Sequence, residues 1–351
     1  MPREPISKIA YKTLQQGKSI AGLAHKEISA RIMNFILPDN DFGQLKIDKE
    51  LLLNIQDSMD RLREEDWHDA EINIYPKKLL FDEPWLRYLT QYPKIWLDMP
   101  NTWDRRRKQN FKDLPKTIDK DNYPQYYLRN FHHQTDGYLS DFSASIYDLQ
   151  VEILFNGSAD AMRRRILKPL KEGLNNFNNR KKDSLKILDV ATGSGRTLKQ
   201  LRGTFPKEKL MGLDLSGSYL KEASRYISDL DGDLIELIKG NAEEIPFDDN
   251  SLQGISCVYL FHELPRTVRE KVLQEFFRVL EPGGILVLAD SIQVSDSPDF
   301  TQIMENFHKS FHEPFYYDYI QEDINNTMGK IGFHNIKSNS FFMTKVWSAI
   351  R

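Results

Sequence analysis

The sequence has 351 residues, enough for two domains, of which 40% are hydrophobic and 28% charged. No apolar stretch approaches the roughly 20 residues that a membrane span requires, and the opening MPREPISKIAYK has no apolar signal-peptide core. A net charge of −3 gives no electrostatic case for nucleic-acid binding. The single cysteine, Cys257, excludes an internal disulfide and a cysteine-based zinc site, so we expect a cytoplasmic protein.

Residues 1–130 are polar, aromatic and helix-like. Apolar residues recur at spacings of three and four in ISKIAYKTLQQ and AHKEISARIMNFIL, and Asp48 is the predicted N-cap of the amphipathic segment that follows it. From 75 to 125, prolines alternate with tryptophans and tyrosines, which indicates short elements wrapped over another surface. We therefore expect a largely helical N-terminal domain that serves as a substrate lid or as an oligomerisation surface of a homodimer.

Residues 131–182 are predicted to form connecting helices and a linker, which ends in NNFNNRKKDS. Within them, MRRRILK at 162–168 lies on a predicted helix, where consecutive residues point in different directions. This pattern favours a solvated face with ion pairs.

Residues 183–351 alternate short apolar runs with helical segments. The predicted strands are LKILDV, KLMGLDL, LIELIKG, GISCVYLF, ILVLAD, GFHNIKSNS and FFMTKVWSAI. Apolar runs joined by helices indicate a parallel sheet covered on both faces, whereas the last two runs follow each other without a helix. We predict an α/β, Rossmann-like, seven-stranded and mostly parallel sheet whose final strand is antiparallel.

The loop after the first of these strands, in ILDVATGSGRTL at 187–198, nearly matches two phosphate-binding patterns. A triphosphate loop requires glycine where Val190 stands and lysine where Arg196 stands. A dinucleotide loop requires a third glycine at Leu198, where the helix packs closely on the strand. The first pattern fits poorly, and the second stays open as a weaker fit.

A third pattern fits better. Asp189 followed by Ala191, Gly193 and Gly195 resembles the loop by which class I methyltransferases bind S-adenosylmethionine, with alanine at the first glycine position. Asp214 ends the second predicted strand 19 residues after Gly195, where an acid accepts ribose hydroxyls. Dinucleotide enzymes use an acid at the same place.

The downstream segment KGNAEEIPFDDNSLQGISCVYLFHELP decides between these patterns. It is similar to the methyltransferase segment in which an acidic or amide residue and an alanine meet the adenine, ahead of the fourth strand. FRVLEPGGILVLAD resembles the same family's approach to its fifth strand. Residues 183–351 thus resemble a class I S-adenosylmethionine-dependent methyltransferase, closest in texture to the ubiquinone/menaquinone-biosynthesis-like enzymes that act on small molecules.

The resemblance implies S-adenosyl-L-methionine as cofactor and transfer by direct displacement at the methyl carbon. The cofactor-binding residues that it implies are Asp189, Ala191, Gly193, Gly195, Asp214, Leu215, Asn241, Ala242, Val258 and Tyr259.

Candidate catalytic residues come from two segments. His262 leaves the end of the fourth predicted strand, where open α/β sheets place their ligands. YYLRNFHHQTDGYLSDFSASIYD at 126–148 is the densest polar and aromatic stretch. We expect it to cap the cofactor site and to bring five residues near the acceptor, of which His133 and Tyr138 are the catalytic candidates: His132, His133, Gln134, Asp136 and Tyr138. Each of these residues also fits a buried hydrogen-bond network. His308 and His312 lie four apart, a spacing that can ligate zinc, but we expect no metal.

The expected partner is a small methyl acceptor, apolar or aromatic and quinone- or phenol-like, with no nucleic acid and no membrane span. The aromatic N-terminal half favours such a closed apolar pocket. A protein or RNA acceptor would instead require an open, charged cleft. A nicotinamide-dependent oxidoreductase and a non-catalytic cofactor-binding module each fit part of the pattern, and carbon, oxygen and nitrogen acceptors are all compatible with it.

Overall fold

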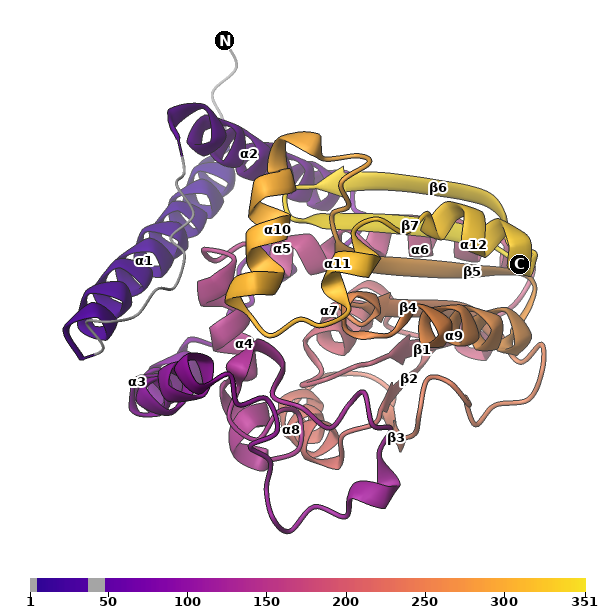
Figure 1. Ribbon diagram of the computed structural model, residues 1–351. Coiled ribbons are helices and arrows are strands. Elements are labelled where there is room, and N and C mark those ends of the chain that lie inside the picture. Colours follow the sequence, from indigo (N-terminus) through magenta and orange to yellow (C-terminus); the bar gives the residue numbers. More distant parts are fainter. Residues whose placement is uncertain (1–4, 37–47) are drawn as a thin grey trace.

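A computed structural model describes residues 5–36 and 48–351 (Figure 1). Its centre is a seven-stranded sheet in the order β3-β2-β1-β4-β5-β7-β6. The strands are β1 Lys186–Val190, β2 Lys209–Asp214, β3 Glu236–Lys239, β4 Leu252–Val258, β5 Leu280–Ser291, β6 His334–Phe341 and β7 Thr344–Ile350. The strand order reverses beside β1, because β2 and β4 flank it on opposite sides. Ligands of open α/β sheets bind at such a reversal.

The first five strands run parallel, and β7 is antiparallel to both of its neighbours. Helices join β1 to β2, β2 to β3 and β4 to β5, and the loop 240–251 joins β3 to β4. By contrast, β6 and β7 are joined by the tight turn Phe342–Met343. A turn this short reverses the chain and makes the pair antiparallel. The predicted fold class is confirmed.

Helices cover both faces of the sheet and form the N-terminal part (Figure 1). They are α1 Ile6–Ile36, α2 Lys49–Glu71, α3 Trp85–Lys108, α4 Asp141–Leu154, α5 Ala159–Arg164, α6 Leu167–Gly173, α7 Arg196–Thr204, α8 Gly217–Ile227, α9 Arg266–Val279, α10 Thr301–Ser310, α11 Tyr316–Tyr319 and α12 Ile324–Ile331. Single 3-10 turns lie at Lys77–Leu80, Lys120–Asn122, Phe131–His133, Leu174–Phe177, Lys182–Ser184, Phe261–Glu263 and Pro298–Phe300. Among these described helices, none combines the length and the apolar character that crossing a bilayer demands.

Alternation along the strands divides the core between the two faces. Leu188 packs on one side with Phe276 of α9. Its neighbour Ile187 packs on the other side with Leu170 of α6 and Leu201 of α7. Both faces are therefore buried, which explains why the parallel strands read as continuous apolar runs.

The N-terminal helices share the core of the sheet. Tyr11 of α1 and Trp67 of α2 are each at most 1% exposed and belong to the same buried cluster as Ile187. At the start of α2, Asp48 accepts a hydrogen bond from the backbone of Leu51, as predicted for an N-cap. The division at residue 130 stays a prediction, but Tyr11 and Trp67 anchor α1 and α2 to the sheet layer. Other apolar residues of α1, such as Ile20 and Leu23, are more than half exposed.

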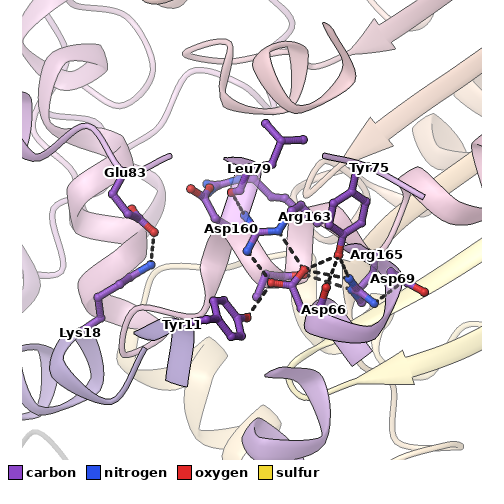
Figure 2. A network of polar contacts seen from close by, with 12 residues as sticks. Tyr11, Lys18, Asp66, Asp69, Tyr75, Leu79, Glu83, Asp160, Arg163 and Arg165 are labelled. Atoms are coloured by element: carbon purple, nitrogen blue, oxygen red, sulfur yellow. Dashed lines mark hydrogen bonds and ion pairs between the residues drawn. The ribbon is translucent and has the colours of Figure 1, made fainter. Parts of the chain in front are cut away.

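A buried polar network joins the same helices to α5 (Figure 2). The carboxylate of Asp66 on α2 accepts bonds from the hydroxyls of Tyr11 and Tyr75, both 2.7 Å, and from Arg164 at 2.6 Å and Arg165 at 2.8 Å. Each cation and each oxygen of this network has partners of opposite character, so the desolvation of the charges is offset.

The basic run at 162–168 departs from the sequence prediction of a solvated face, which is wrong. Arg163, Arg164 and Arg165 are at most 5% exposed. The acids that neutralise them lie on other elements, such as Asp66, 98 residues from Arg164, or on the turn before, as Asp160 does for Arg163. Helical periodicity carries no information about such distant acids.

Candidate functional site

The glycine-rich loop between β1 and α7 needs its glycines for two different reasons. Ala191, Gly193 and Gly195 all have left-handed backbone, with φ of 56°, 54° and 86°. A Cβ at Gly195 would lie 3.1 Å from the Cβ of Ala223 on α8, so this glycine lets two helices approach. A Cβ at Gly193 would meet nothing closer than 4.0 Å, so the space beside Gly193 is open to a ligand.

Leu198 departs from the dinucleotide pattern, and the structure shows what replaces the missing glycine. Leu198 is fully buried on α7. A Cβ at Gly212 on β2 would lie 2.7 Å from the Cδ1 of Leu198. Close packing of the helix on the strand is therefore permitted by a glycine of the strand, Gly212, and not by a glycine of the helix. The triphosphate pattern fails for another reason: Arg196 turns its guanidinium away to an ion pair with Asp160.

A pocket lies at the carboxyl ends of β1, β2 and β4, beside the reversal of strand order. Of the residues predicted to bind cofactor, those that line it are Ala191, Gly193, Asp214, Leu215, Asn241, Ala242, Val258 and Tyr259. Segments that are distant in the sequence meet here because the ends of parallel strands share one edge.

Asp189 and Gly195 do not line this pocket. The carboxylate of Asp189 is 1% exposed and accepts hydrogen bonds of 2.7 Å from Ser256 and from Thr192. Burial raises the pKa of Asp189 to about 7. Asp189 therefore holds the loop against β4, and no direct contact with a ligand's ammonium is available to it from this position.

Asp214 faces the pocket at the end of β2. Its two oxygens accept 2.8 Å bonds from the backbone N–H groups of Gly193 and Ser216, which leaves lone pairs toward the cavity. Burial raises the pKa of Asp214 to about 6. Beyond β3, Asn241 lines the pocket beside Glu243, whose carboxylate accepts a 2.6 Å bond from the hydroxyl of Tyr126.

Tyrosines close the pocket from the N-terminal side. Four of them come from the segment predicted as a cap and one from α8: Tyr126, Tyr127, Tyr138, Tyr147 and Tyr219. The rings of Tyr138, Tyr147 and Tyr219 meet edge to face with centroids 5.5–6.0 Å apart. The predicted placement of segment 126–148 over the pocket matches this geometry. The sequence singles out only Tyr138 among these rings.

Three charged lining residues were missed by sequence reasoning: Arg163, Arg196 and Glu263. Arg163 reaches the pocket from α5 and is paired with Asp160 at 2.9 Å. Glu263, which follows the predicted His262, reaches it from the turn after β4, and its carboxylate accepts a hydrogen bond from Tyr138. The sequence offered one indication of Glu263: it directly follows His262, which was already predicted to lie at the end of a strand.

The two predicted catalytic histidines lie outside the pocket. His262 turns its Nδ1 to the buried carboxylate of Asp290, 2.6 Å away. Burial lowers the pKa of His262, but Asp290 outweighs this and raises it above the ordinary value. The ring of His133 packs beside the rings of Phe111 and His312, and burial together with Arg106 lowers its pKa to about 4. His133 is therefore a neutral packing residue beside the lid, and no contact joins it to the pocket.

His132, which was also expected near the acceptor, lies outside the pocket lining and faces two carboxylates. Its Nε2 lies 3.4 Å from Glu263 and its Nδ1 lies 3.1 Å from Glu313. With His262 these residues form a group in which one candidate ligand atom from each lies within 4.8 Å of the others. Burial lowers the pKa of His132, but Glu313 and Glu263 together raise it above its ordinary value.

The predicted proximity of His308 and His312 on one helical face is wrong. The helix α10 ends at Ser310, and His312 stacks on Phe111 with ring centroids 3.6 Å apart, whereas His308 lies beside Tyr317. The spacing of four residues does not bring the imidazoles together once the helix has ended.

Comparison with known proteins agrees with this geometry. Residues 187–284 match the family model of a methyltransferase domain. The demethylmenaquinone methyltransferase of Listeria monocytogenes is 32% identical over 122 residues, 34% of this chain and 50% of that protein. That of Thermotoga maritima is 30% identical over 177 residues, 50% of this chain and 70% of that protein. A solved S-adenosylmethionine-dependent methyltransferase from Aquifex aeolicus is 21% identical, with a TM-score of 0.38, over 54% of this chain and 92% of that one.

The chain belongs to the class I S-adenosylmethionine-dependent methyltransferases. Within them it falls in the group that includes the ubiquinone/menaquinone-biosynthesis methyltransferases, and the cofactor is S-adenosylmethionine. The chain spans about half the length of the Listeria relatives. The open space beside Gly193 and the carboxylate of Asp214 fit an amino acid joined to a nucleoside.

Proposed function

We propose that the protein methylates a small apolar or aromatic acceptor, such as a quinone or a phenol. The observation that carries this proposal is the tyrosine-lined cover of the pocket. A pocket closed by aromatic rings suits a flat apolar molecule, since it removes apolar surface from water. The relatives named for demethylmenaquinone support the same substrate class.

Different residues of the pocket would bind different parts of the cofactor. Asp214 would accept hydrogen bonds from both ribose hydroxyls. Asn241 and the backbone N–H of Ala242 would form hydrogen bonds with the edge of the adenine ring. Arg163 pairs with the carboxylate of the methionine part, a role that its position on the pocket wall supports. When bound, the cofactor supplies an activated methyl group on its sulfonium.

The protein's own contribution to the reaction is then positioning and proton transfer. Tyr138 and Glu263 stand together on the wall, with the tyrosine hydroxyl donating to the carboxylate. Glu263 takes the proton from a hydroxyl of the methyl acceptor, and the tyrosines exclude water from the pocket. Alignment of the reacting atoms contributes up to roughly 7–11 kcal/mol of the barrier in such sites.

Isothermal calorimetry with S-adenosylhomocysteine, NADH and ATP tests the cofactor. We expect one S-adenosylhomocysteine per chain and no heat from the other two. Binding of NADH instead would favour an oxidoreductase.

A screen with cofactor labelled in its methyl group, on quinone, phenol and carboxylic-acid extracts, tests the acceptor. We expect label in an apolar aromatic product. Label in protein or RNA alone would contradict the proposed substrate class.

A further inference from the structure

The cluster of His132, His262, Glu263 and Glu313 lies beside the pocket and is not needed to hold the cofactor. It joins the end of β4 to the 3-10 turn at 131–133 and to the segment after α10. We propose that these four side chains bind one divalent transition-metal ion of the zinc type. The proposal departs from the sequence expectation of no metal. It shares Glu263 with the proposed function: the Oε1 atom faces the cluster, and the second carboxylate oxygen is left for the acceptor.

The spacing of the four residues suits one ion. Zinc bonds of about 2.0–2.2 Å place tetrahedral ligand atoms about 3.3–3.6 Å apart. One ligand atom from each of the four residues lies within 4.8 Å of the others. The Nε2 atoms of His132 and His262 lie 3.4 Å and 3.8 Å from the Oε1 of Glu263, and Glu313 lies 3.1 Å from the other nitrogen of His132, Nδ1. Because one ion binds only one nitrogen of a histidine, side-chain rotations that close gaps of up to 4.8 Å bring four donors onto one centre.

Glu313 is the second observation that points to a ligand. The residue is 2% exposed, and in the described part of the chain neither of its carboxylate oxygens has a well-aligned hydrogen-bond partner. The Nδ1 of His132 likewise lacks an aligned partner, although the Oε1 of Glu313 lies 3.1 Å away. Two buried groups that approach without forming a hydrogen bond are arranged as ligands of a shared cation.

His262 has the support that metal-binding histidines need. Its Nδ1 bonds Asp290, which is fully buried and also accepts the backbone N–H of Phe261 at 2.6 Å. A carboxylate on one ring nitrogen fixes the proton there and leaves the Nε2 lone pair free toward the cluster. Such carboxylate–histidine pairs orient the imidazole and strengthen it as a ligand.

The donor set selects the kind of ion. Two imidazoles and two carboxylates suit zinc and its neighbours, whereas magnesium and calcium prefer oxygen ligands alone. Aromatic rings of Phe307 and Phe311 face His132, and those of Tyr316 and Tyr319 face His262. These rings flank the cluster, and Glu263 also lines the pocket.

Metal titration of the chelator-treated full chain tests the site without cofactor or acceptor. Co²⁺ is the coloured probe, followed by visible absorption and elemental analysis, and Zn²⁺ is the competitor. We expect one Co²⁺ per chain and its displacement by Zn²⁺, with no displacement by Mg²⁺. Glu313→Gln and His132→Asn should each weaken binding by at least about a hundredfold, beyond the 10–100-fold typical of outer-sphere changes.

His312→Asn is the matched control, because it removes a nearby imidazole that lies outside the cluster, and it should keep full binding. Circular dichroism checks the fold of each variant, and either of the two cluster variants suffices if the other unfolds. Absence of stoichiometric Co²⁺ in the wild-type chain, or full binding in a folded cluster variant, would overturn the proposal. Because no methyl transfer is measured, this result is separate from the test of the proposed function.

Discussion

Two of the buried sets of charged side chains in this protein have opposite chemistry. In the network around Asp66, the carboxylate is surrounded by Arg164, Arg165 and two tyrosines (Figure 2). At the pocket edge, Asp189 and Asp214 have only hydroxyl and backbone donors.

The same burial therefore shifts the pKa values in opposite directions. Burial alone would raise the pKa of Asp66, but Arg164 and Arg165 hold it at about 2. Without such cations, burial raises the pKa of Asp189 to about 7 and that of Asp214 to about 6. The contrast indicates that the first network stabilises the fold, whereas the acids at the sheet edge are kept available for ligands or protons at some cost in stability.

Asp66→Ala is expected to have the largest effect on this contrast. The change leaves two buried arginines without their shared acid and should lower the free energy of unfolding by about 3–5 kcal/mol. Because the folded pKa of Asp66 lies below that of the unfolded chain, its contribution is present above about pH 4 and is lost as the pH falls toward 2. Urea unfolding at several pH values measures both.

Asp57→Ala is the matched control for Asp66→Ala. Asp57 pairs with Arg61 on the same helix, but both side chains are more than 60% exposed. Water solvates each partner when the other is lost, so no measurable change is expected. A loss as large as that of Asp66→Ala would break the assignment of stability to the buried network.

Asp189→Asn should show the opposite pH dependence. The folded carboxyl has a higher pKa than the unfolded one, so stability falls as the pH rises from about 4 to about 7. Asparagine removes this loss, and the variant should be more stable at pH 8 by up to about 4 kcal/mol. Thermal unfolding between pH 4 and 8 measures the difference. An unchanged pH profile would contradict a raised pKa.

Asp214→Asn should affect binding more than folding. Loss of a charged hydrogen-bond acceptor costs about 1.5–3 kcal/mol, so the affinity for S-adenosylhomocysteine should fall by about 10–100-fold. The melting temperature should fall only modestly, because one of the two backbone N–H groups, those of Gly193 and Ser216, keeps an acceptor oxygen and the other loses it. Calorimetry measures the affinity and a thermal melt of the same sample measures the stability. A variant that loses stability but keeps its affinity would show that Asp214, like Asp66, serves the fold and not the ligand.

Tyr138→Phe is expected to have the smallest effect. The variant loses the hydroxyl that bonds Glu263 but keeps the aromatic wall, so turnover should fall about three- to tenfold with unchanged cofactor affinity. His133→Asn, outside the pocket, serves as control. Equal loss of turnover in both would mean that the lid acts through its packing and not through the Tyr138 hydroxyl.

The sequence by itself determined the sheet, the glycine loop and the part of the pocket wall that the ends of the strands supply. These features are local: apolar runs mark buried strands, and Gly193 or Asp214 sits at the end of a strand that the pattern already defines. The ends of neighbouring parallel strands then meet at one edge without further information.

Only the tertiary structure decided which charges are buried together. The sequence predicted a solvated basic run where Arg164 is fully enclosed with Asp66, and it favoured His133 where His132 faces Glu263 and Glu313. The left-handed backbone at both histidines, with φ of 54° and 57°, turns neighbouring side chains in directions that no periodicity encodes. Partners far apart in the chain are chosen by packing, because the pKa of a buried acid depends on what lies beside it and not on its place in the chain.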